Sequence, residues 1–320
     1  MNVNDLDFND SRVKEFLAKQ ESSKIHWGDH YRMDLLDLIS NGDELQGIKL
    51  PWGSTADKVR LGYGDVSIWA GVSGHLKSFV LGQVAFHAAK EHPVGIASFE
   101  LTVAKTMYRM TCQAAGSAQP AIRYANDFAT WMNGRMAFYN RLDSVDKNRV
   151  LACVHHMATE MGCRLVVVDS LMMVSGIAGD AEAEKEFMAS LAALAKGLDI
   201  HIALVHHVRK GDSRQGDGYI PRKEDVKGNG AIMDLASLGV VCWNNKKKKE
   251  YKSRLDFGGT LSPEEQDEYD NTPDQFLSIV KQRHGEFEGK IPLWIHDSVQ
   301  FVARNDRRAI PFDIPRMEDS

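Results

Sequence analysis

The segment from Gly71 to Ser78 has the residue types and spacing of a phosphate-binding loop. It reads "GVSGHLKS", and the P-loop pattern G-x-x-x-x-G-K-[ST] is matched at Gly71, Lys77 and Ser78. In such a loop the backbone N–H groups face an anion at a helix start, the lysine reaches the β- and γ-phosphates, and the hydroxyl binds Mg²⁺. The residues that we expect around ATP are Gly71, Ser73, Gly74, His75, Leu76, Lys77, Ser78 and Phe79.

Leu76 stands where the pattern has its second glycine. A glycine lets the backbone approach the phosphates without a Cβ, so a leucine is expected to tighten or distort the loop and to weaken ATP binding. Gly74 takes over some of the flexibility. The site is therefore either active or able to bind ATP without turning it over, and the other site residues favour activity.

Two acids follow strands in the way that phosphate transfer requires. Asp169 ends the apolar segment "RLVVVD", as expected of the strand whose acid holds Mg²⁺ through water, although a helix-capping role would explain the same residue. Glu100 ends "VGIASFE" and is placed to orient the attacking water. Together with the loop, these matches predict a P-loop NTPase.

The elements around these residues alternate between strand and helix. Apolar segments such as "DVSIWAG", "VGIASFE", "RLVVVDSLMMV" and "IHIALVHHV" are separated by helical patterns such as "KSFVLGQVAFHAAKEH", with a mostly helical stretch up to about residue 162. Continuous apolar strands alternating with helices predict an α/β fold with a mostly parallel sheet flanked by helices. The segment "QFLSIVKQRHGEFEGKIPLWIHDSVQFV" predicts antiparallel edge strands at the C-terminal end.

Three regions are predicted along the chain of 320 residues. Residues 1–45 form an arm with a helix around 10–20, residues 46–304 form the ATPase domain, and residues 305–320 form a loose tail. Residues 209–230 form a long loop rich in glycine and charge, which is typical of a functional segment. The run Lys246–Lys249 is interpreted as a solvated turn between strands.

Composition excludes several classes of protein. The net charge of -5 does not indicate a protein that is basic overall, although a local basic stripe is enough to bind nucleic acid. No stretch reaches the roughly 20 apolar residues of a membrane helix, and the N-terminus does not have the pattern of a signal peptide. The four cysteines have no metal-ligand spacing, which is typical of reduced thiols in a cytoplasm.

The order of several segments resembles the RecA-like ATPase domain of DnaB-type hexameric replicative helicases. Besides the loop and the acidic strands, "LVHHVRK", "DVKGNGAIMDLAS" and "IVKQRHGEFEGKIPLW" follow one another as in that family, over about residues 45 to 303. The phage primase-helicases are the most similar group, helicase part only. The resemblance implies a cytoplasmic protein of a bacterium or a phage-infected cell, which binds ATP and Mg²⁺ and assembles as a homo-oligomeric ring on single-stranded DNA. Movement would be 5′ to 3′, and a primase or loader would be a separate chain.

The resemblance also assigns roles to single residues. Lys77 and Ser78 bind phosphate and Mg²⁺, Asp169 completes the metal site and Glu100 is the catalytic carboxylate. Further roles are implied for His207 as the sensor of the γ-phosphate and for Lys281 and Arg283 as the pair that reaches the γ-phosphate of a neighbouring subunit. DNA contacts are expected at Arg209, Lys210, Arg214, Arg222, Lys223, Lys227, Gly228 and Asn229.

Two other functions stay open on the sequence. A RecA- or RadA-like recombinase has the same core, but "KGNGAI" and "KQRHGE" favour the helicase. A replication accessory protein that binds ATP and whose hydrolysis Leu76 impairs is the other alternative. Some of the assigned residues also have a purely structural interpretation. His207 could be a core histidine, and Lys281 and Arg283 could form an ordinary exposed face of a strand.

Overall fold

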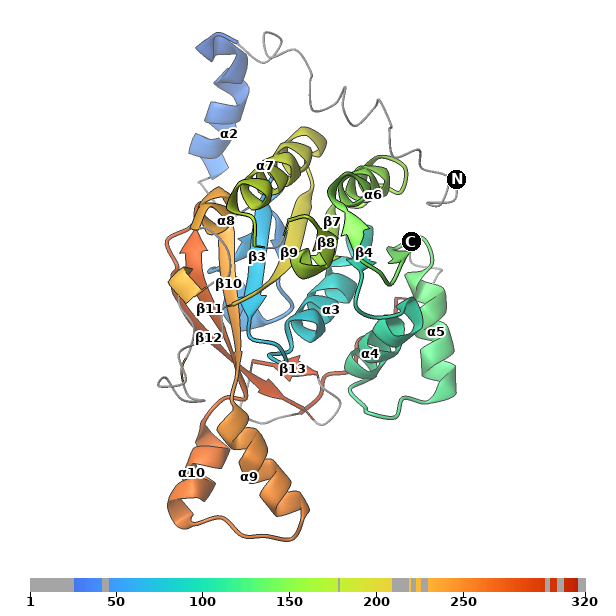
Figure 1. Cartoon of the computed structure of the whole chain (residues 1–320), viewed down its shortest axis with the longest axis vertical. Coiled ribbons are helices and arrows are strands. Elements are labelled where there is room, and N and C mark those ends of the chain that lie inside the picture. The colour runs from blue at the N-terminus through green and yellow to red at the C-terminus, as the bar shows by residue number, and fades with distance from the viewer. Residues whose placement is uncertain are drawn as a thin grey trace.

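A twisted sheet forms the centre of the protein, of which a computed structural model describes residues 26–41, 46–177, 179–208, 219, 223–225, 230–296, 300–303 and 308–315. In that part of the chain the main sheet has nine strands in the order β13-β12-β11-β10-β3-β9-β7-β4-β5 (Figure 1). The predicted α/β architecture is confirmed.

The parallel part of the sheet consists of strands that are apolar along their whole length. Its strands are β3 (Val66–Gly71), β4 (Val94–Ser98), β5 (Met136–Asn140), β7 (Leu165–Asp169), β9 (His201–His207) and β10 (Leu238–Asn244). Helices cover both faces, so alternate side chains of every strand enter one of two hydrophobic cores. One face packs against α3 (Lys77–Ala88), α4 (Val103–Ala115) and α5 (Ile122–Met132), and the other against α6 (Lys147–Thr159), α7 (Ala181–Leu198) and α8 (Gly230–Leu235).

The strands formed by the C-terminal part of the chain are antiparallel, as predicted. There β10 pairs with β11 (Gln275–Gln282), β11 with β12 (Gly289–Ile295), and β12 with β13 (Phe301–Val302). The smaller elements are η3 (Gly28–Tyr31), α2 (Arg32–Asn41), β1 (Ile48–Lys49), η4 (Gly53–Thr55), β2 (Arg60–Leu61), β6 (Val145–Asp146), η5 (Leu171–Met173), β8 (Val174–Ser175) and η7 (Lys223–Asp225). The stretch expected to be mostly helical contains β5, because "MAFYN" pairs with β4 at the sheet edge.

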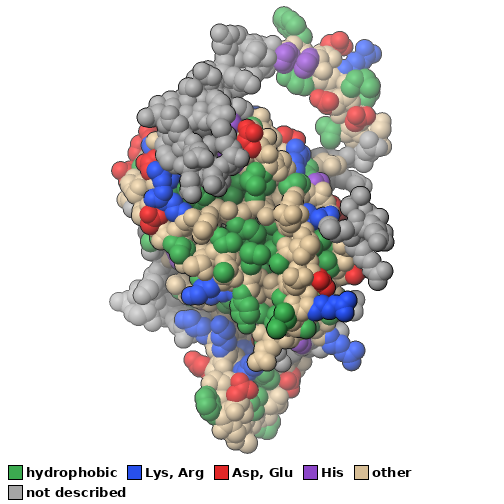
Figure 2. Space-filling view, turned by 90° about the vertical axis from the view of Figure 1, so that its right-hand side faces the viewer, with side chains coloured by type: hydrophobic (Ala, Val, Ile, Leu, Met, Phe, Trp, Pro, Cys, Tyr) green, Lys and Arg blue, Asp and Glu red, His purple; other side chains and the backbone are tan. Residues whose placement is uncertain are grey.

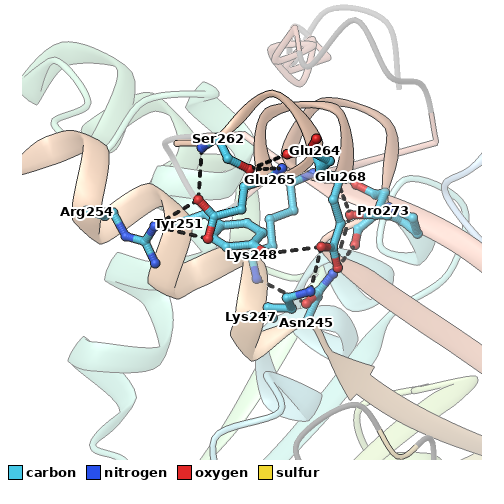
Figure 3. A network of polar contacts seen from close by, with 11 residues as sticks. Asn245, Lys247, Lys248, Tyr251, Arg254, Ser262, Glu264, Glu265, Glu268 and Pro273 are labelled. Atoms are coloured by element: carbon cyan, nitrogen blue, oxygen red, sulfur yellow. Dashed lines mark hydrogen bonds and ion pairs between the residues drawn. The ribbon is translucent and has the colours of Figure 1, made fainter. Parts of the chain in front are cut away.

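The basic run that begins at Lys246 is helical, so the prediction of a turn is wrong. It opens α9 (Lys246–Asp256), which forms a projecting hairpin with α10 (Pro263–Asn271) between β10 and β11 (Figure 1). The side chain of Asn245 caps α9 by accepting from the N–H of Lys248 at 3.1 Å. Ion pairs between basic residues of α9 and acids of α10 then hold the two helices together (Figure 3).

The C-terminal stretch 308–315 packs on the domain, which corrects the expected loose tail. Phe312 is 4% exposed and its ring lies 4.9 Å from Trp131 and 5.3 Å from Phe86, centroid to centroid. Its N–H donates to the carbonyl of Ala114 at 2.7 Å. One buried aromatic side chain therefore anchors a segment that was predicted to be loose.

The described part of the N-terminal arm, η3 and α2, projects away from the domain (Figures 1 and 2). Met33, Leu35 and Ile39 of α2 are 66%, 55% and 70% exposed. The helix predicted around residues 10–20 lies outside the described residues. Within the described residues, no helix is both long and apolar enough to cross a membrane.

Candidate nucleotide site

The phosphate-binding loop connects the carboxyl end of the central strand β3 to α3, as the motif predicted. A Cβ on Gly71 would lie 2.6 Å from the carbonyl oxygen of Cys242, so this position accepts only glycine. Gly74 has φ of +83°. Leu76, directly before α3, has φ of 57° and ψ of 24°, the left-handed conformation that a glycine adopts without penalty. The leucine is thus accommodated in a strained backbone, at a cost of about 1–2 kcal/mol.

Lys77 is held inside the loop. It is 6% exposed, and its Nζ donates to the carbonyl oxygens of Gly71 at 3.0 Å and Val72 at 3.2 Å. Burial lowers its pKa, which the nearby carboxylates of Asp169 and Glu100 partly offset. Phosphate oxygens would offer this ammonium group stronger, charged acceptors than the loop carbonyls.

Asp169 and Ser78 meet at the start of α3 and bring two oxygen donors together. Ser78 Oγ donates to Asp169 Oδ2 at 2.5 Å, and Asp169 is 6% exposed. Burial raises the pKa of Asp169 to about 6, although the hydrogen bond from Ser78 opposes this shift. Hard oxygen donors, few in number and close to the expected phosphates, suit Mg²⁺, which usually keeps several waters.

Glu100 lies after the neighbouring strand β4 and is oriented by a residue that the sequence did not reveal. Ser170, which follows Asp169, donates from Oγ to Glu100 Oε1 at 2.8 Å. The strand β7 therefore positions both acids, one as its own last residue and the other through the next side chain. A serine in "VVVDS" has no sequence signal for this role.

These groups line one depression with a volume of about 220 Å³. Its walls are Ser73, Gly74, Leu76, Lys77, Ser78, Phe79, Glu100, Arg109, Asp169, Val205 and His207. His207 lines the depression because β9 pairs with β3, which places His207 opposite Gly71. Arg109 of α4, whose guanidinium lies 4.5 Å from the centre of the Phe79 ring, is a cation that the sequence analysis missed. A single arginine in an amphipathic helix carries no signal for such a place.

His75, predicted to contact the nucleotide, has its ring against β10 instead of in the depression. It is 5% exposed, with Nδ1 3.4 Å from the carbonyl oxygen of Cys242. Burial lowers its pKa to about 4, so the ring is neutral at pH 7. Gln275 of β11 donates to the His75 carbonyl at 3.3 Å, so His75 joins the loop to the antiparallel strands.

Lys281 and Arg283 do not lie at the nucleotide site of their own chain. The N–H of Arg283 donates to the carbonyl of Ser237, whose N–H donates to Val66, the first residue of β3. The loop with Lys77 follows the last residue of β3. The two cations therefore lie near the amino end of β3, and the nucleotide site lies at its carboxyl end.

Both cations contact the end of α8. Lys281 Nζ donates to the carbonyl oxygens of Met233 at 2.9 Å and Asp234 at 2.6 Å, and Arg283 donates to that of Asp234 at 3.3 Å. Lys223 pairs with the Asp234 carboxylate at 3.0 Å. Of the expected DNA-contacting residues, Lys223 alone has a described side chain, and Arg209, Lys210, Arg214, Arg222, Lys227, Gly228 and Asn229 lie outside the described residues.

Comparisons with known proteins agree with the fold. Residues 57–213, about half of the chain, match the family described as an AAA domain. A solved ATPase domain is similar with a TM-score of 0.68 and 14% identity, covering 87% of this chain and 99% of the other. A solved DnaB-like replicative helicase, studied with its interactions with primase, has a TM-score of 0.64 and 14% identity, covering 87% of this chain and 67% of the other. The predicted resemblance in fold is therefore confirmed.

Proposed function

We propose, from the premise that this chain has the ATPase-domain fold of DnaB-like replicative helicases, that it is an ATP-dependent replicative DNA helicase. It would translocate on single-stranded DNA as a homo-oligomeric ring, 5′ to 3′, and couple ATP hydrolysis at subunit interfaces to unwinding. A primase is a candidate partner, because the similar DnaB-like helicase interacts with one.

The observation that carries this proposal is the separation of two groups of residues. Lys77, Glu100 and Asp169 surround one depression, while Lys281 and Arg283 lie at the other end of the same sheet. A rigid sheet keeps the two ends of its strands apart, so Lys281 and Arg283 could reach only the γ-phosphate of an ATP bound to another copy of the chain. Repeating such a head-to-tail contact closes a ring when the rotation allows it.

The projecting helix α2 supports assembly between copies. Its apolar side chains are exposed on more than one face, with Leu38 at 51% and Leu36 at 45%. A helix that is apolar in this way gains stability only when a surface covers it. An adjacent subunit is the partner that a ring supplies to every copy.

Each residue of the site would have a separate role in ATP hydrolysis. Lys77 and the loop N–H groups would bind the phosphates, and Ser78 and Asp169 would hold Mg²⁺, which neutralises charge on the phosphate oxygens when bound. Glu100, held by Ser170, would orient the attacking water and accept its proton. His207 lines this depression and precedes the predicted DNA loop by two residues in the sequence, and it would transmit the state of the γ-phosphate.

The conformation of Leu76 supports an active enzyme over an impaired one. Its left-handed backbone keeps the turn that the motif requires, and the acids and Lys77 line the depression with it. The recombinase alternative uses the same core, and electron micrographs that show filaments instead of rings would favour it.

The test is ATP hydrolysis by the purified protein with and without single-stranded DNA, together with nucleotide binding. Lys77→Ala should abolish turnover and weaken ATP binding. Arg283→Ala should lower turnover at least a hundredfold while ATP binding stays unchanged, because the arginine acts on a neighbouring copy in the transition state. Arg254→Ala, which removes an exposed arginine of the hairpin, is the matched control and should hydrolyse ATP normally. Full turnover by Arg283→Ala would overturn the proposed interface, and failure of the natural protein to hydrolyse ATP would favour the accessory role.

A further inference from the structure

Ser98, the last residue of β4, is a buried hydroxyl that the hydrolysis scheme does not use. It is 7% exposed, and within the described part of the chain its Oγ has no hydrogen-bond partner. Such a group costs free energy unless a water or ligand satisfies it. The position of Ser98 indicates what that partner is.

A small cavity lies beside Ser98, on the face of the sheet that α3 and α4 cover. Its volume of about 30 Å³ exceeds the roughly 10–15 Å³ that one water needs. Four residues with polar side chains, Ser98, Thr106, Arg109 and Asp169, are among those that line it. A water there would therefore find several partners.

The same cavity adjoins the candidate magnesium site. Ser78, Phe79, Arg109 and Asp169 line both this cavity and the nucleotide depression. Ser98 is directly opposite Asp169 in the pairing of β4 with β7. Asp169 thus belongs both to the expected cation site and to the lining of a water-sized space beside an unsatisfied hydroxyl.

We propose that Ser98 is a positioning residue of the magnesium site, and that it holds a water in this cavity which hydrogen-bonds to the Asp169 carboxylate. Ser78 donates to one oxygen of that carboxylate, and the water bound by Ser98 restrains the group from behind. The carboxylate is then turned toward the cation before Mg²⁺ arrives. This inference rests on the proposed function, because it concerns the Mg²⁺-nucleotide complex.

The test measures how binding of a fluorescent ADP analogue depends on Mg²⁺ concentration. Ser98→Ala should raise the Mg²⁺ concentration for half-maximal binding about tenfold, since residues that orient metal-binding groups commonly contribute this much. Affinity for the analogue in EDTA should not change. Ser98→Thr retains the hydroxyl and should bind Mg²⁺ within about twofold of the natural protein.

Ser278→Ala is the matched control, because Ser278 is also a buried serine without a partner in the described chain but lies on β11. It should leave the Mg²⁺ dependence unchanged. An unchanged Mg²⁺ dependence in Ser98→Ala, with normal folding by circular dichroism, would overturn the inference and leave a structural water as the role of the cavity. Unchanged ADP binding in Lys77→Ala would instead overturn the nucleotide site itself.

Discussion

Replacement of Asp169 by asparagine should stabilise the nucleotide-free protein while removing its use of Mg²⁺. Burial raises the pKa of Asp169 from 3.8 to about 6. The folded state therefore binds more protons than the unfolded state between about pH 4 and 6, so stability falls as the pH rises through that window. An asparagine does not ionise and avoids this loss, and its amide oxygen can still accept the hydrogen bond from Ser78.

The magnitude follows from the shift in pKa. The rise of this pKa from 3.8 to about 6 is equivalent to about 3 kcal/mol at pH 8, and linkage reduces the effect to about half of that at pH 5. The new amide N–H group must also find an acceptor, so a gain of about 1–3 kcal/mol is expected at pH 8. In a chain of this size that raises the melting temperature by several degrees.

Thermal unfolding of both proteins at pH 5 and pH 8, with and without Mg²⁺ and ADP, provides the measurement. Asp169→Asn should melt higher at pH 8, and its advantage over the natural protein should be clearly smaller at pH 5. Addition of Mg²⁺ to the ADP complex should stabilise the natural protein only. An asparagine variant that melts at or below the natural protein at pH 8, or an advantage independent of pH, would refute the assignment of a desolvated carboxylate.

Three other substitutions test the structure by urea unfolding. Leu76→Val should lower the free energy of unfolding by about 1–3 kcal/mol and weaken ADP binding, because a β-branched residue tolerates the left-handed conformation poorly. A variant as stable as the natural protein would argue against the left-handed conformation at this position. Lys248→Ala should lower the free energy of unfolding by about 2–4 kcal/mol, because Lys248 is 3% exposed and its loss leaves Asp274, 3.3 Å away, without this partner. Lys247→Ala should lower it by less than about 1 kcal/mol, because the ion pair of Lys247 is exposed. Equal costs would contradict the packing of the hairpin. Phe312→Ala should cost about 3–5 kcal/mol, and a negligible cost would show that residues 308–315 are not anchored.

Local sequence was enough to predict the elements that carry the chemistry. The strand before Gly71, the helix after it and the apolar strand that ends in Asp169 all have short-range patterns, and each formed where expected. Burial on both faces requires continuous apolar strands, so the parallel sheet follows from composition within single segments. The antiparallel strands could be predicted for a different reason, because their segment has the pattern of strands joined by turns.

Tertiary structure decided which side chains meet. Ser170 reaches Glu100 across 70 positions of sequence, and Arg109 enters the depression from a helix without a motif. The hairpin at Lys246 forms because Asn245 caps it and acids of α10 pair with it, contacts that a run of lysines does not reveal.

Phe312 shows the same limit at the C-terminal stretch, where a single ring fills a gap between α3 and α5. Sequence patterns report the period of a segment and its local hydrogen bonds. They do not report which partner the packing of distant segments will bring to each side chain, because that choice depends on the whole sheet and the helices that cover it.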